Sequence, residues 1–200
     1  MRIGIDIDGV LTNLEQYVLD YMTEYCVENN IEYSIGKSNY HYFKMFNITR
    51  EQENIFWDRK LEEYAKNEKA RPFASEVIKK LKKEGHEIYI ITARWLTNRD
   101  DELGVNMRNI VKNWLKENEI YYDLLVFSKA DKERKKEEIL DYKIDIMIED
   151  SPNNIKDLSK VVPIICYDAG YNQDCNGDNI TRCYSWYDIY NTVLYTTDTV

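Results

Sequence analysis

Long apolar runs are missing from this sequence of 200 residues. The longest, such as 88–91 and 161–166, fall far short of the roughly 20 residues that a helix needs to cross a bilayer. Glycine and proline are scarce, with 7 and 3 residues, which excludes collagen-like and low-complexity chains. Because 44% of the residues are hydrophobic and 13% are aromatic, a disordered chain is excluded as well. The sequence therefore predicts one folded, soluble domain, or a domain with a modest insertion.

Positive charge is in deficit. The chain has 27 lysine and arginine residues against 36 acidic residues, which gives a formal net charge of -9. Such a chain repels phosphate backbones, so we expect no nucleic-acid partner. A single small anion is a different case, because a bound divalent cation can supply the local positive charge that it needs. The composition is therefore compatible with a ligand that carries one phosphate.

Cysteine and histidine are also rare, with 4 and 2 residues. The cysteines show no CxxC spacing, so we interpret them as reduced structural thiols and expect neither disulfides nor zinc. His41 and His86 have no partner at a metal-binding spacing, and we assign them no role. The chain begins Met-Arg-Ile-Gly-Ile-Asp, with an acid by position 6, which is unlike a signal peptide. We therefore expect a cytoplasmic protein with no membrane partner.

Short apolar runs alternate with helical patterns over most of the chain. Strands are predicted at 2–8, 86–92, 123–127, 144–149 and 161–167, and helices at 73–84, 102–118, 132–140, after Ser151 and after Ser185. Apolar strands separated by helices are typical of a parallel sheet covered on both faces. The sequence thus predicts an α/β fold with a Rossmann-like parallel sheet, in which ligands bind beyond the carboxyl ends of the strands.

One segment interrupts this alternation. From about Leu14 to Ala70 the pattern is helical without a convincing strand, and Arg71-Pro72 marks its end, because the residue before a proline is disfavoured in a helix. We interpret the segment as a helical insertion after the first strand. It is rich in aromatic residues, namely Tyr40, Tyr42, Phe43, Phe46, Phe56 and Trp57. At helical spacing such residues form a core more often than a substrate surface, although one or two could face a substrate.

Chemically active residues stand where the predicted strands end. In chain order they are Asp6 and Asp8 with Gly9 after them, Thr92, Lys129 and Lys132, and the pair Glu149 and Asp150. An acidic pair alone is more often a helix cap or a turn than a catalytic pair. In a parallel sheet, however, all these ends lie at one edge, so that carboxylates, a hydroxyl and an ammonium group converge. Their convergence favours an active site.

This combination of groups fits phosphoryl transfer. An aspartate can form a covalent aspartyl-phosphate, and we assign Asp6 as the nucleophile. Asp8 is placed to protonate the leaving alkoxide and then to deprotonate the attacking water. Mg²⁺ prefers a few carboxylates together with waters and substrate phosphate, which Asp6, a backbone carbonyl at Asp8, and Asp150 can provide. Thr92 and a lysine would hold the phosphoryl oxygens.

Four motifs resemble, in the same order along the chain, those of the haloacid dehalogenase (HAD) superfamily of phosphatases: Asp6-Ile-Asp8-Gly-Val, Ile-Thr92, Lys132 and Glu149-Asp150. The insertion resembles the type I cap of that superfamily, and the combination is similar to the 5'(3')-deoxyribonucleotidases and their bacterial nucleotidase relatives. The resemblance implies a HAD-like core made of residues 1–12 and 71–200, with a helical cap at 13–70.

The resemblance also implies that Thr92, Ala93 and a lysine bind the phosphate. For this lysine we favour Lys132, which opens a helix 18 residues before Asp150. The alternative, Lys129, lies nearer to the strand end and is more easily a solvated loop residue.

Two positions depart from the nucleotidase pattern. Glu149 stands where nucleotidases commonly carry a first aspartate, so the metal role passes to Asp150, and Glu149 becomes an outer-shell or water-held residue. Arg94 follows Thr92 and Ala93 where small residues and proline are usual. It could clamp a phosphate or a base, or it could be a surface arginine at the start of a loop.

The sequence as a whole predicts a Mg²⁺-dependent phosphomonoester hydrolase, and the resemblance implies a nucleoside monophosphate as its substrate. A phosphatase for a sugar phosphate or another small phosphoester is the alternative, because the insertion carries no motif that identifies the leaving group. A non-catalytic module that binds Mg²⁺ or phosphate is disfavoured, since it would have no need of Asp8. Whether the chain forms a homo-oligomer is left open.

Overall fold

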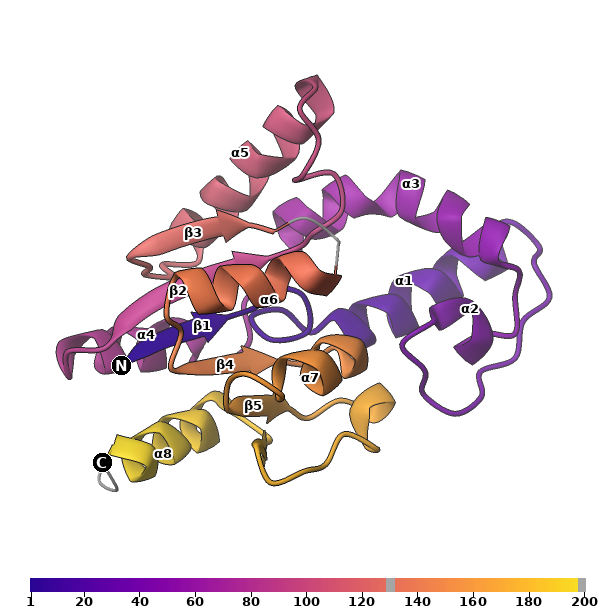
Figure 1. Cartoon of the computed structure of the whole chain (residues 1–200). Helices are drawn as coiled ribbons and strands as arrows, with labels where there is room; N and C mark the ends of the chain where they lie inside the picture. Colours follow the sequence, from indigo (N-terminus) through magenta and orange to yellow (C-terminus); the bar gives the residue numbers. More distant parts are fainter. Residues whose placement is uncertain (129–131, 198–200) are drawn as a thin grey trace.

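A parallel β-sheet organises the molecule, with helices on both of its faces (Figure 1). The computed structural model describes residues 1–128 and 132–197. The strands follow the order β3-β2-β1-β4-β5-β6 across the sheet, and all neighbours are parallel. They are β1 (Arg2–Ile5), β2 (Glu87–Thr92), β3 (Leu124–Phe127), β4 (Ile146–Glu149), β5 (Ile164–Tyr167) and β6 (Ile180–Cys183). The predicted α/β fold with a Rossmann-like parallel sheet is confirmed.

The helices run between the strands, except for a group that follows β1. They are α1 (Leu14–Glu28), α2 (Tyr42–Met45), α3 (Arg50–Asn67), α4 (Ala74–Lys83), α5 (Glu102–Glu117), α6 (Lys132–Asp141), α7 (Pro152–Leu158) and α8 (Trp186–Thr197), with a 3-10 turn η1 (Gly170–Asn172). No helix within the described ranges is long and apolar enough to span a membrane.

Two apolar layers hold the helices against the sheet. Alternate strand residues such as Ile5 and Ile90 pack with α4, α5 and α8 on one face. Residues of the opposite phase, such as Ile91 and Met147, pack with α6 and α7 on the other face. The central strands are therefore apolar on both sides, which explains why their pattern shows up in the sequence as continuous apolar runs.

The first strand ends earlier than predicted. It stops at Ile5 because the chain then turns: the amides of Val10, Leu11 and Thr12 all donate to the carbonyl oxygen of Ile7. Gly9 lies in this turn with φ +82°, and a Cβ there would lie only 1.9 Å from a carboxylate oxygen of Asp150. Only glycine fits this position, and the turn thereby brings the loop after β1 against the end of β4.

The insertion forms a separate group of helices beyond the carboxyl ends of the strands (Figure 1). Residues of α1, α2 and α3 share their own apolar cluster, and α3 begins with a capping box of Thr49 and Gln52. The chain enters and leaves it side by side, through a bridge between Thr12 and Ala70. Arg71 ties the two connections together, because its side chain donates to the carbonyl oxygens of Thr12 and Gly9.

Candidate active site

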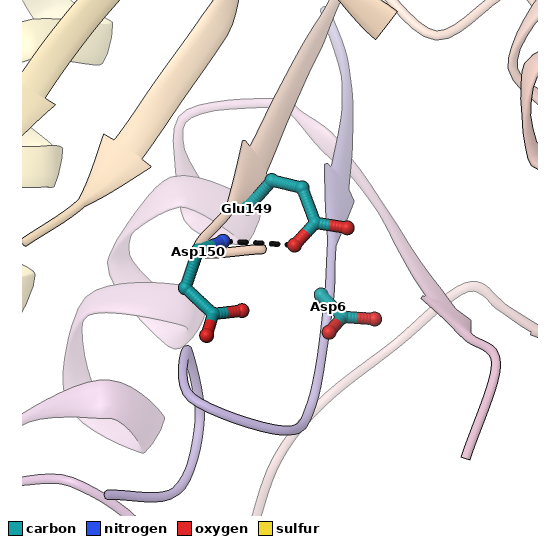
Figure 2. Close-up of side chains that lie close together, drawn as sticks. All are labelled: Asp6, Glu149 and Asp150. Carbon is teal, nitrogen blue, oxygen red and sulfur yellow. Dashed lines mark hydrogen bonds between the residues drawn. The ribbon is translucent and has the colours of Figure 1, made fainter. Parts of the chain in front are cut away.

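Three buried carboxylates meet at the carboxyl ends of β1 and β4. Asp6 follows β1, Glu149 ends β4 and Asp150 comes next, and one oxygen of each lies within 4.8 Å of the others. The strands are paired in register, and the Asp6 amide donates to the carbonyl oxygen of Ile148 at 3.1 Å. Figure 2 shows Asp6 and Asp150 with their carboxylates turned toward the same space. The sequence placed these acids together, and the sheet register is the reason.

A lysine from α6 reaches into this cluster. Lys135 is buried, and its Nζ lies 3.0 Å from Oδ1 of Asp6 and 2.6 Å from Oε1 of Glu149. Glu149 also accepts from Asn154 and, through its other oxygen, from the amides of the next two residues. Four hydrogen bonds occupy the usual acceptor sites of a carboxylate. Glu149 is therefore engaged in holding Lys135 against Asp6, which leaves Asp6 and Asp150 as the acids with capacity for a cation.

Hydrogen bonds from the 3-10 turn η1 hold Asp150 in place. Tyr171 donates its hydroxyl hydrogen to Oδ2 of Asp150, and the side-chain amide of Asn172 donates to the Asp150 carbonyl oxygen. The close approach of Gly9 covers the same carboxylate. These contacts orient an acid that has no positively charged partner within the described ranges, which suits a ligand of a hard cation.

Burial and mutual repulsion disturb the titration of the cluster. Burial raises the pKa of Asp6 to about 7, against the opposing effect of Lys135 and with the help of Glu149. Burial and the neighbouring carboxylates Glu149 and Asp6 also raise the pKa of Asp150 well above its ordinary value. For Glu149 burial acts in the same direction, but Lys135 and the hydrogen bonds outweigh it and lower the pKa. A divalent cation between Asp6 and Asp150 would relieve this repulsion.

Asp8 lies outside the acid cluster and is bound by other residues. The guanidinium of Arg94 forms an ion pair with it, with Nη2 at 2.5 Å from Oδ1, and the hydroxyl of Tyr64 donates to the same oxygen at 2.8 Å. Arg94 is only 4% exposed, so its interpretation as a surface arginine is wrong. Its Nη1 is buried and has no hydrogen-bond partner in the described part of the chain.

The loop after β2 lies beside the turn after β1. Thr92 is buried at the end of β2, and Ala93, which follows it, is half-buried. The Thr92 hydroxyl oxygen accepts a hydrogen bond from the Arg94 amide at 3.3 Å. Because β2 pairs with β1, with Ile90 level with Ile5, this loop adjoins the Asp6 turn, as the sequence predicted. Phosphate binding by Thr92 and Ala93 stays a prediction.

The prediction that Lys132, or else Lys129, binds the phosphate is not tested by the described side chains. Lys129 lies outside the described residues; Lys132 is the first residue of α6, and its side chain is not described. Among the lysines whose side chains the structure describes, the one that contacts Asp6 is Lys135, one turn further along the helix. We expected the charged run from Glu133 to Glu138 to be a solvated face, and this was wrong for Lys135, which is 3% exposed. The run contains several similar charged residues, so the sequence does not distinguish Lys135 from them. Which of them faces the acid cluster depends on the rotation of α6 about its axis.

The aromatic stretch of the insertion mostly forms a core. Tyr42, Phe46 and Phe56 are buried in the cluster shared by α1, α2 and α3. Trp57 is partly buried and lines a groove between α3 and α5 together with the exposed Trp95. The interpretation of these aromatic residues as a core is therefore confirmed for Tyr42, Phe46 and Phe56.

Comparison with known proteins identifies the family of the chain. Residues 1–198 match the family described as 5' nucleotidase, deoxy (pyrimidine), cytosolic type C. A nucleotidase of Clostridium acetobutylicum is 28% identical over 194 residues, which covers 96% of this chain and 93% of the relative.

Two solved structures share the fold. A predicted phosphatase from Clostridium acetobutylicum has a TM-score of 0.62 at 16% identity, with 97% of this chain and 98% of that chain covered. D,D-heptose 1.7-bisphosphate phosphatase from B. bronchiseptica, solved with magnesium and phosphate, has a TM-score of 0.54 at 10% identity, with 98% and 99% covered. The chain thus belongs to the 5' nucleotidase, deoxy (pyrimidine), cytosolic type C family and is a nucleotidase-like phosphatase, and it shares its fold with solved HAD-superfamily hydrolases.

Proposed function

We propose that the protein hydrolyses phosphomonoesters with the help of Mg²⁺, through an aspartyl-phosphate on Asp6, and that its substrate is a nucleoside monophosphate. The observation that carries the proposal is the surroundings of Asp6. One of its carboxylate oxygens is held by the buried Lys135, while Asp150 lies beside it without a cationic partner among the described residues. A nucleophile for a phosphate dianion needs such a combination of fixed positive charge and room for a cation.

The residues present fit Mg²⁺. Asp6 and Asp150 offer carboxylate oxygens, and the backbone carbonyl of Asp8 is the third protein ligand that we propose, all of them hard oxygen donors. Bound there, Mg²⁺ would offset the charge of the carboxylates and of the substrate phosphate, so that one anion can approach another. The remaining chemistry falls to side chains of the chain itself.

The reaction then takes two steps. A carboxylate oxygen of Asp6 forms a bond to phosphorus while the bond from phosphorus to the leaving oxygen breaks, and Asp8 gives this oxygen a proton. Lys135, Thr92 and the amide of Ala93 hold the phosphoryl oxygens. In the second step Asp8 takes a proton from a water that attacks phosphorus, and the bond to Asp6 breaks, which releases inorganic phosphate.

The insertion is proposed to act as a cap over this site. It supplies 37–41 to a cavity of about 270 Å³ whose other walls include Asn153 and Tyr171 of the core. Tyr171 also donates to Asp150, so this one side chain connects the wall of the cavity to the acid cluster. A cavity walled by both parts of the chain suits a substrate with a sizeable leaving group, and the similarity to nucleotidases supports a nucleoside there.

A substrate panel tests this proposal. Purified protein is assayed for phosphate release from nucleoside monophosphates, sugar phosphates and p-nitrophenyl phosphate, with Mg²⁺ and with EDTA. We expect Mg²⁺-dependent release with the highest kcat/KM for a nucleoside monophosphate. A preference for sugar phosphates would overturn the substrate assignment alone, whereas full activity in EDTA would overturn the proposed use of a metal.

A further inference from the structure

The two oxygens of the Asp8 carboxylate are in unequal surroundings. Oδ1 accepts from Nη2 of Arg94 at 2.5 Å, from its Nε at 3.1 Å and from the Tyr64 hydroxyl at 2.8 Å. Among the described residues, Oδ2 accepts only from Nε of Arg94, at 3.1 Å. A carboxylate oxygen has about two acceptor sites. Oδ1 is therefore saturated by the protein, while Oδ2 keeps the capacity to exchange a proton with another group.

The groups that hold Oδ1 are themselves fixed. The Tyr64 hydroxyl, which donates to Asp8, accepts a hydrogen bond from Oγ1 of Thr12 at 2.6 Å, and Thr12 belongs to the turn after β1. The Arg94 guanidinium lies over the Tyr64 ring, 5.2 Å from its centre, and both side chains are buried. The arrangement joins three parts of the chain: the turn that carries Asp8, the loop after β2, and helix α3 of the insertion.

We propose that Arg94 and Tyr64 are positioning residues that fix Asp8 with Oδ2 directed to the reacting oxygen atoms, and that Tyr64 links this orientation to the insertion. The inference rests on the proposed acid and base role of Asp8. A proton passes from Oδ2 to the leaving oxygen as its bond to phosphorus breaks, and returns to Oδ2 from the attacking water. A misplacement of about 1 Å in such a transfer can lower the rate roughly 100-fold, so the orientation of Asp8 matters for kcat.

Tyr64 is the sharper test, because Tyr64→Phe removes only the hydroxyl and keeps the ring in its place. We expect kcat to fall by about 10-fold with KM changed less than about twofold, since the contacts of this hydroxyl are to Asp8 and Thr12. Tyr17→Phe is the matched control. Tyr17 is buried in the same aromatic cluster, with its ring 4.7 Å from that of Tyr64, and the one hydrogen bond of its hydroxyl within the described residues is a 3.5 Å contact to the Lys60 carbonyl oxygen. This variant should keep the wild-type kcat.

A double-mutant cycle with Asp8→Asn separates positioning from a general structural role. Activity is measured on p-nitrophenyl phosphate, whose good leaving group leaves a measurable residual rate. If Tyr64 acts through Asp8, Tyr64→Phe has no further effect in the Asp8→Asn background. Arg94→Lys should fall between wild type and Arg94→Met, which we expect to lose about 100-fold in kcat, because lysine keeps the charge but not the paired geometry.

Two results would overturn the proposal. One is an equal loss of kcat from Tyr64→Phe with and without Asp8→Asn, and the other is a Tyr64→Phe enzyme that matches the Tyr17→Phe control. Should Asp8→Asn itself retain the wild-type kcat, the acid and base role in the proposed function fails, and this inference fails with it. Thermal melting of each variant shows whether it is folded, and Tyr64→Phe keeps the test decisive if the Arg94 variants do not fold.

Discussion

Asp6 and Asp8 stand two residues apart in one turn, yet their surroundings are opposite. Asp6 lies among Glu149 and Asp150 with Lys135 beside them, so three carboxylates face one ammonium group among the described side chains. Asp8 has a buried arginine of its own and a tyrosine hydroxyl. In a regular strand, residues two apart would share a face, but β1 has already ended at Ile5. The turn is what separates the two acids.

The difference in charge indicates a difference in role. With all groups ionised, the Asp6 side carries a formal excess of two negative charges, whereas Asp8 and Arg94 balance one another. Within the described part of the chain, the first side has fewer cations than carboxylates, and the second has one of each. We therefore expect metal and phosphate chemistry to depend on the Asp6 side, and proton transfer to depend on the Asp8 side. The variants below test how far this division holds.

The largest effect should come from Asp6→Asn. Without a carboxylate the variant cannot form the aspartyl-phosphate, and we expect kcat to fall by at least roughly 10⁴-fold, to the limit of detection. Asp20→Asn, at an exposed position of α1, is the matched control and should keep full activity. Release of phosphate at a near wild-type rate by Asp6→Asn would show that another group is the nucleophile.

The next largest effect should come from the lysine of α6. Lys135→Met removes the ammonium group that lies 3.0 Å from Asp6, and we expect kcat to fall by about 10²-fold to 10³-fold, as for the loss of one oxyanion donor. Lys132→Met, three residues earlier on the same helix, should change kcat only a few-fold. If Lys132→Met is the damaging variant and Lys135→Met is mild, the sequence-based assignment of Lys132 is the correct one.

Substitutions of the two acids at the end of β4 should change different kinetic quantities, the Mg²⁺ requirement for Asp150 and kcat for Glu149. Asp150→Asn should raise the Mg²⁺ concentration needed for half-maximal activity by at least about 10-fold, because it removes one of the carboxylates that can accept the cation. Glu149→Gln should instead lower kcat with little change in this concentration, since Glu149 holds Lys135. Titrations of activity with Mg²⁺ distinguish them, and a reversed pattern would make Glu149 the ligand.

The sequence revealed the Asp6 side of the site more fully than the Asp8 side. Buried parallel strands produce continuous apolar runs, so the positions of Asp6, Thr92 and Asp150 at strand ends follow from a local pattern. The topology of the sheet then brings these ends together without any knowledge of side-chain packing. Strand β6 escaped prediction because this short strand at the sheet edge contains few apolar residues.

The partners of these acids could not be found in the same way. Lys135 lies in a run of mixed charges whose buried face depends on the phase of α6. Tyr64 reaches Asp8 from α3, 56 residues away, and its position depends on how the insertion packs on the core. Arg94 gave a local signal, an arginine where the resemblance led us to expect a small residue. That signal could not show whether Arg94 binds a phosphate or a base or lies at the surface. An arginine side chain is long enough to reach several different partners, and the sequence does not say which one it contacts.

The smallest expected effect is on the thermal stability of the metal-free protein, which should depend on pH through Asp6. Burial raises the pKa of Asp6 to about 7, above the value near 3.8 that an unfolded chain would have. Between these two pH values the folded protein binds a proton that the unfolded chain releases, so the contribution of Asp6 to stability falls as pH rises from about 4 to 7. In EDTA, the Tm of the wild type relative to Asp6→Asn should therefore drop by on the order of 5 °C between pH 5 and pH 8.

Asp6→Asn is the right reference here because its neutral amide resembles the protonated acid at every pH, while all other groups titrate alike in both proteins. Mg²⁺ takes the place of the proton, so we expect it to raise the Tm of the wild type more at pH 8 than at pH 5, and to raise that of Asp6→Asn less at both. A Tm difference between the two metal-free proteins that stays constant from pH 5 to pH 8 would mean that Lys135 neutralises Asp6 fully, and that the Asp6 side needs a cation no more than the Asp8 side does.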